Sequence, residues 1–113
     1  MFFNPEITVW LCKDRLDMRK SINGLSIAVA SNMNKNPSSG EIFLFFGKHS
    51  DRVKILYWDR NGFCLYYKRL EKGKFKIPVD NPSISYEQLS WLLAGLDISN
   101  LQGHQKLSYK HFF

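Results

Sequence analysis

Apolar side chains recur along this chain in short segments whose spacing predicts strands and helices in turn. Alternating stretches rich in β-branched and aromatic residues indicate strands at 7–12, 42–46, 53–59 and 63–70, and a fifth, shorter strand is expected at 74–77. Glycine, proline, asparagine and serine separate several of these stretches, so the connections between them are predicted to be turns and loops.

Two further stretches carry apolar residues three and four positions apart, the spacing of an amphipathic helix. The first helix is predicted to begin at Asp17 as its N-cap. Its buried stripe is expected to consist of Met18, Ile22, Leu25, Val29 and Met33. The second helix is predicted to begin at Ser85, which has Gln88 at the spacing of a capping box, and to end near Gly95.

The segment from Asp59 to Gly62 predicts a hairpin between the strands at 53–59 and 63–70, because Asn-Gly tolerates the positive φ angles of a tight turn. A two-residue Asn-Gly loop would place Lys54 opposite Arg69. A type I turn with a glycine bulge would instead place Lys54 opposite Lys68. Both registers set two cations across from each other, which costs roughly a few tenths of a kcal/mol.

The predicted order of strand, helix, three strands and helix indicates an α+β fold. We expect an antiparallel meander sheet of four to five strands packed against two helices. A single α+β domain is expected over residues 1–100. Residues 101–113 are expected to form a basic C-terminal tail that is either disordered or docked elsewhere.

The composition is that of an ordinary globular domain. With 113 residues, 44% of them hydrophobic, the chain can build one core without a metal or disulfide. Its start lacks the features of a signal peptide, and no apolar run approaches the roughly 20 residues that span a bilayer. Cys12 and Cys64 fit no metal or redox spacing and are expected to be buried free thiols. These features predict a cytosolic protein.

Positive charge is concentrated in the middle of the chain. The formal net charge is +6, and residues 48–76 carry nine basic side chains against the acidic Asp51, Asp59 and Glu71. Such a stretch indicates either a surface for a polyanion or a solvated face that keeps the protein soluble. In the predicted hairpin, lysines and arginines interleave with tyrosines and a tryptophan, a mixture typical of nucleic-acid binding without base reading. The aromatic residues could equally fill the core.

A second candidate anion site is the start of the first helix. Arg19 and Lys20 are predicted to lie in its opening turn, where free amide groups and two cations would suit a phosphate. The candidate nucleic-acid-binding residues are therefore Arg19, Lys20, Lys48, Arg52, Lys54, Lys68, Arg69, Lys72, Lys74 and Lys76.

Catalytic chemistry is not indicated. A nuclease needs clustered carboxylates that hold metal ions, whereas the ten acidic residues here are scattered. His49, His104 and His111 have no metal-ligand spacing. We therefore expect no catalytic residue, no metal, no cofactor and no small-molecule substrate, and we interpret the protein as a non-enzyme.

Three segments resemble the accessory protein of a known bacterial transposon family. Residues 17–25 begin with Asp-Met-Arg-Lys, which resembles a signature near the start of the TnpB-type proteins encoded by the second open reading frame of insertion sequence 66. Residues 40–75 resemble the central block of that family, and residues 92–97 resemble its closing helix. The chain departs from the family at residues 48–50, where Lys-His-Ser stands in place of two or three arginines. This departure predicts weaker phosphate binding there, or pH-sensitive binding through His49.

The resemblance implies a role in DNA transposition, beside a separate and larger transposase chain that cuts the DNA. The leading hypothesis is an accessory factor that binds the DNA backbone with weak sequence preference, in the bacterial cytoplasm near the nucleoid and without membrane contact. The alternative is a protein-interaction module that docks on the transposase without binding DNA. Its candidate contacts are Trp91, Phe112, Phe113 and any exposed aromatic residue of the hairpin. A third hypothesis is regulation of the transposase's expression.

Overall fold

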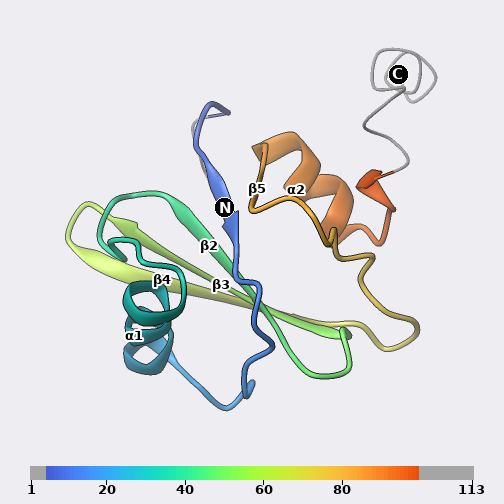
Figure 1. The fold of residues 1–113 in the computed structure, drawn as a ribbon, viewed down its shortest axis with the longest axis horizontal. Coiled ribbons are helices and arrows are strands. Elements are labelled where there is room, and N and C mark those ends of the chain that lie inside the picture. The colour runs from blue at the N-terminus through green and yellow to red at the C-terminus, as the bar shows by residue number, and fades with distance from the viewer. Residues whose placement is uncertain (1–4, 100–113) are drawn as a thin grey trace.

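The computed structural model describes residues 5–99 and shows an α+β fold, which confirms the predicted class (Figure 1). Its five strands form one sheet with the order β4-β3-β2-β1-β5. The elements are β1 (Val9–Leu11), α1 (Ile22–Asn32), β2 (Ile42–Phe46), β3 (Arg52–Asp59), β4 (Gly62–Arg69), β5 (Ser83–Ile84) and α2 (Tyr86–Leu93). The predicted tail at 101–113 lies outside the described residues.

The sheet is mixed, so the expectation of a wholly antiparallel meander is wrong in one part. β2, β3 and β4 do form an antiparallel meander, but β1 pairs parallel to β2, with Val9 beside Ile42. The connection from β1 to β2 contains α1, and a crossover of this kind returns the chain to the end of the sheet from which it started. β5 pairs antiparallel to β1 and was not predicted, whereas residues 74–77 form no strand.

Each face of the sheet is covered by one helix. Alternate residues of β2 point to opposite faces: Ile42, Leu44 and Phe46 pack in the cluster that includes α2, while Phe43 and Phe45 pack against α1. All five residues of β2 are buried, as expected for a strand covered on both sides. The molecule is therefore built in three layers, with β4 as the longer of the two edge strands.

The second helix begins and ends as predicted. Ser85 is its N-cap, and the capping box is complete: the Gln88 amide donates to Ser85 Oγ (3.0 Å) and the Ser85 amide donates to Gln88 Oε1 (2.9 Å). The chain leaves the helix through Gly95, whose φ of 89° favours glycine.

The first helix begins later than predicted. Its first residue is Ile22 and its N-cap is Ser21. Asp17 instead stabilises a turn, in which its Oδ1 accepts the Arg19 amide (2.9 Å) and its carbonyl accepts the Lys20 amide (3.0 Å). Arg19 and Lys20 therefore precede the helix, and the prediction that they occupy its opening turn is wrong.

The predicted hairpin is present, but its register differs from both registers expected from the sequence. Asp59 pairs with Gly62, so the two-residue turn consists of Arg60 and Asn61, and Arg60 has a φ of 56°. Lys54 therefore lies opposite Tyr67, not opposite a cation.

Both cysteines are free: Cys12 is buried, as expected, and Cys64 is half-buried. Neither helix in the part of the chain between residues 5 and 99 is long and apolar enough to cross a membrane.

Candidate nucleic-acid interface

The strand directions bring several basic segments to one end of the sheet. β1 and β2 are parallel, so the loops that follow them meet at their carboxyl ends, and β3 begins and β4 ends at the same place. In Figure 1 this is the lower part of the view, where the chain after β1, the green β2–β3 loop and the end of β4 converge. The basic residues in or beside these segments are Lys13, Arg15, Arg19, Lys20, Lys48, Arg52, Lys54, Arg69, Lys72 and Lys74.

A cleft of about 640 Å³ lies at this end of the sheet, which we call the basic cleft. It is lined by Arg15, Leu16, Asp17, Met18, Gly47, Lys48, His49, Asp51 and Arg52. Its cations come from the loop after β1, the loop after β2 and the start of β3. Clefts beyond the carboxyl ends of parallel strands are frequent ligand sites, because several loops converge there.

A close contact between two loops shapes the basic cleft. A Cβ atom at Gly47 would lie 2.7 Å from Met18 Cγ, so only glycine lets the Met18 side chain pack there. Met18 also packs against the buried cluster beneath α1. The β2–β3 turn is tight, since the Gly47 amide donates to the Arg52 carbonyl (3.2 Å) and Ser50 has a φ of 61°. The two cleft-forming loops are thus fixed against each other.

Two arginines face each other where the basic cleft meets the sheet. Arg52 and Arg69 are direct partners in the antiparallel β3–β4 pair, and both are exposed. The side chains of directly opposed residues lie on the same face of a sheet about 5 Å apart at Cβ, and two like charges in this arrangement are unfavourable. Sequence reasoning expected such a pair at Lys54, and the structure places it two residues earlier.

Two of the cations are paired with carboxylates. Arg19 Nη2 lies 2.6 Å from Asp17 Oδ2, and hydrogen bonds from Arg19 lower the pKa of Asp17 to about 2. Arg69 Nη2 lies 3.2 Å from Glu71 Oε1, which raises the pKa of Arg69. Both pairs are solvent-exposed and contribute little to stability. Between residues 5 and 99, Arg15, Lys20, Lys48 and Arg52 take part in no ion pair.

Lys54 connects the sheet to the start of α1. Its Nζ donates to the Lys20 carbonyl (2.7 Å) and lies 5.6 Å from the centroid of the Tyr67 ring. The stem of Lys20 packs over Gly24, where an added Cβ would be 3.3 Å from Lys20 Cβ and Cγ. Lys20, Lys54 and Tyr67 therefore adjoin the arginine pair on the α1 face of the sheet.

Lys68 is separated from the other candidates, because it lies on the opposite face. Its neighbour across the hairpin is Val53, whose side chain belongs to the cluster on the α2 side. The Lys68 ammonium donates to the Leu93 carbonyl (2.8 Å) at the end of α2. A cation at a helix C-terminus is favourable because it opposes the negative end of the helix dipole.

The loop after β4 is anchored next to the β2–β3 turn. The Phe75 amide donates to the Ser50 carbonyl (2.7 Å), and the Phe75 ring packs against Phe46 with centroids 5.9 Å apart. The remaining candidates on this loop, Lys72, Lys74 and Lys76, are exposed around that anchor.

Sequence comparison identifies the family of the chain. A sequence model of the family described as "IS66 Orf2 like protein" matches residues 7–103. The chain belongs to the IS66 Orf2-like family. The resemblance noted in the three sequence segments is thereby confirmed, and membership supports an accessory role in the transposition of an insertion sequence.

Two relatives of this IS66 Orf2-like protein come from Sinorhizobium fredii (strain NBRC 101917 / NGR234). The uncharacterized protein y4hO is 35% identical over 94 residues, which cover 80% of this chain and 82% of the relative. The uncharacterized protein y4jC is 37% identical over 94 residues, which cover 80% of this chain and 80% of the relative. No solved structure matches the chain.

Arg15 is a cleft residue of this IS66 Orf2-like protein that sequence reasoning missed. It lies in the loop after β1 and lines the basic cleft. The sequence carries no local signal for it, because only the parallel pairing of β1 and β2 brings this loop beside residues 47–52. The segment Lys48-His49-Ser50, where the chain departs from the family pattern, contributes Lys48 and His49 to the same cleft.

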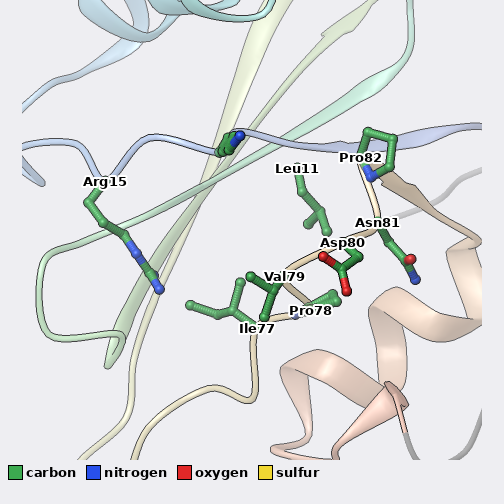
Figure 2. A pocket seen from close by; sticks show the side chains of 9 residues that line it. Leu11, Arg15, Ile77, Pro78, Val79, Asp80, Asn81 and Pro82 are labelled. Carbon is green, nitrogen blue, oxygen red and sulfur yellow. The ribbon is translucent and has the colours of Figure 1, made fainter.

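Arg15 also lines a second cleft of about 550 Å³, shown in Figure 2. Its walls are Leu11, Lys13, Arg15, Ile77, Pro78, Val79, Asp80, Asn81 and Pro82. In this view the aliphatic side chains of Ile77 and Val79 lie between Arg15 on one side and Asp80 on the other. Val79 is 90% exposed, which is unusual for a large apolar side chain.

Nowhere between residues 5 and 99 do three His, Cys, Asp or Glu side chains lie close enough together to hold a metal ion.

Proposed function

We propose that this protein is a non-catalytic accessory factor in transposition that binds the DNA backbone at the basic end of its sheet. The observation that carries the proposal is the Arg52–Arg69 pair, directly opposed on β3 and β4 and continuous with the cations of the basic cleft. Opposed like charges are unfavourable in the free protein. A phosphate between or beside the two guanidinium groups would offset that repulsion and bind through charge-assisted hydrogen bonds.

The proposed contacts form a central and an outer group. The central group consists of Arg15, Lys20, Lys48, Arg52, Lys54 and Arg69, of which Arg69 is also paired with Glu71 and is included because it lies directly opposite Arg52. The outer group consists of Arg19, which shares its charge with Asp17, and the exposed Lys72, Lys74 and Lys76. Lys68 is proposed to stabilise α2 instead, because its ammonium group is held by the Leu93 carbonyl on the other face.

Backbone contacts are favoured over base reading because neither helix is suited to a DNA groove. α1 and α2 contain no lysine or arginine, and their only charged residue is Glu87. Base reading in the major groove usually relies on a helix that presents arginine, lysine, asparagine or glutamine side chains to the bases. We therefore expect weak sequence preference and an affinity dominated by phosphate contacts.

The salt dependence of DNA binding tests this proposal. Fluorescence anisotropy with a labelled duplex would be measured at several salt concentrations. If about six phosphates are neutralised, log K falls with log salt at a slope of about −5. The double variant R52Q/R69Q is expected to make the slope less steep by about 2.

A matched control for this experiment is the double variant K35Q/R60G, which removes the same amount of charge at the opposite end of the sheet. Arg60 lies in the hairpin turn with a φ of 56°, which suits glycine, and Lys35 lies in the loop that precedes β2. This control should keep the wild-type slope. Absence of binding at low salt, or an affinity that does not change with salt, would rule out the proposal.

Docking on the transposase is the second candidate function, and the second cleft supports it. Val79 is almost fully exposed beside Leu11, Ile77 and the two prolines Pro78 and Pro82. Val79 and Pro82 are exposed, while Leu11 and Pro78 are buried and Ile77 is half-buried, so Val79 is the main apolar contact that this cleft offers to a partner protein. A pull-down of separately expressed transposase, at high salt and with nuclease present, tests this function. Wild-type protein should retain the transposase and V79D should lose it.

A further inference from the structure

Tyr67 is an exposed aromatic residue within the basic surface. It is 48% exposed and lies on the edge strand β4, opposite Lys54 and next to the pair formed by Arg52 and Arg69. Phe63 and Leu65 share its face of the strand but pack against the cluster beneath α1, to which Tyr67 does not belong. Tyr67 is therefore the residue at which this row of side chains leaves the cover of the helix.

The surroundings of Tyr67 distinguish it from an ordinary surface tyrosine. The Lys54 ammonium lies 5.6 Å from its ring centroid. Arg69 follows Tyr67 by two residues in β4, so its side chain leaves the same face of the strand beside the ring. A base stacked on this ring would thus have its own phosphate, or the next one, within reach of a cation. Alternation of aromatic faces with cations is how proteins hold single strands without reading their sequence.

A paired base in a duplex is stacked on both sides and does not present its face to a protein surface, so stacking on the exposed ring favours an unpaired base. We propose that Tyr67 is a stacking platform for an unpaired base and that the preferred ligand of the basic surface is single-stranded DNA. This inference rests on the proposed function, because it names the form of DNA that the same surface binds.

The test compares one sequence as a labelled single strand of about 20 nucleotides and as a duplex of equal length. The variants are Tyr67→Val, which keeps a β-branched residue in the strand but removes the ring, and Tyr67→Phe, which keeps the ring. Stacking of one base corresponds to a loss of about fivefold to 150-fold in affinity when the aromatic ring is removed. Y67V should show this loss for the single strand and less than about a twofold change for the duplex, while Y67F should bind both forms like the wild type.

A second measurement locates the contact directly. A single strand that carries 5-iododeoxyuridine would be photo-crosslinked to the wild-type protein, and the modified residue identified by mass spectrometry. The inference predicts a crosslink at Tyr67. Equal losses for both DNA forms in Y67V, or no loss in either, would overturn the stacking role and leave salt-dependent backbone binding in place. Absence of any salt-dependent DNA binding by the wild type would overturn the proposed function as well.

Discussion

Gly47 lies so close to the side chain of Met18 that a Cβ atom at position 47 would approach Met18 Cγ to 2.7 Å. The variant Gly47→Ala must therefore displace Met18 from the cluster beneath α1. Overpacking of this kind costs about 1–3 kcal/mol, so we expect the free energy of unfolding to fall by that amount, as measured by urea denaturation.

Gly62→Ala is the matched control for this prediction, because nothing lies within 4 Å of an added Cβ at Gly62. Its stability should be close to that of the wild type. The double variant G47A/M18A removes the side chain that the new Cβ would strike. Its loss of unfolding free energy should therefore be smaller than the sum of the losses measured for G47A and for M18A, because the two sites are coupled. Additive losses would contradict the contact.

The hydrogen bond from Lys68 to the Leu93 carbonyl predicts a structural role for this cation. Lys68→Met keeps the apolar stem but removes the ammonium group from the end of α2. Loss of a partly buried hydrogen bond from a charged donor should lower the free energy of unfolding by about 1–2 kcal/mol in urea denaturation. The exposed Lys72→Met should leave stability unchanged. A large loss of DNA affinity in K68M under conditions where it is fully folded would contradict this assignment.

The sequence predicted β2, β3 and β4 well because alternation with a period of two is a local signal, whereas β5 was missed and the strand expected at 74–77 is absent. β2 begins and ends as predicted, and β3 and β4 differ from the prediction by one residue at their boundaries. The register of the hairpin depends on which two residues form the turn, and here Arg60 takes the positive φ that was assigned to the Asn-Gly pair. A one-residue change of register moves every side chain of a strand to the other face. Lys68 and Arg69 are consecutive in β4 and lie on opposite faces in any register; they were grouped because both belong to the basic stretch 48–76, and charge concentration does not distinguish the two faces.

The basic cleft could be predicted only in part. Lys48 and Arg52 follow from the central concentration of charge, whereas Arg15 lies outside it and reaches the cleft because β1 pairs parallel to β2. Composition carries no information on strand direction. The start of α1 was misplaced for a different reason: Asp17 is a good N-cap by type, but its carboxylate is used by the Arg19 amide in a turn before the helix.

The pairing of Asp17 with Arg19 predicts a pH dependence of stability. The pKa of Asp17 is lowered from 3.8 to about 2 in the folded protein, chiefly by the hydrogen bonds from Arg19. A lowered folded-state pKa stabilises the fold above the unfolded-state pKa, and this stabilisation is lost as the pH falls from about 4 to about 2. NMR titration of the carboxyl carbon should give a pKa near 2 in the wild type and a higher pKa in R19A, which loses the side-chain bonds but keeps the amide bond of residue 19 to Asp17 Oδ1. Equal values in the two proteins would contradict the pairing.

The opposed arginines predict that Arg52, a proposed DNA contact, lowers the stability of the free protein. Arg52 takes part in no ion pair with another residue between 5 and 99, so Arg52→Thr breaks no favourable pair. The substitution removes the repulsion between Arg52 and Arg69 and should raise the free energy of unfolding by about a few tenths of a kcal/mol. The gain should shrink at high salt, where exposed charges are screened over about 3 Å at 1 M. Because threonine also favours strands, R52T must be repeated in the R69T background, where the salt-dependent part of the gain should vanish. The same variant should bind DNA more weakly than the wild type. If R52T instead lowers stability, and does so in the R69T background as well, then Arg52 stabilises the fold. That result would contradict the argument that repulsion between Arg52 and Arg69 favours phosphate binding.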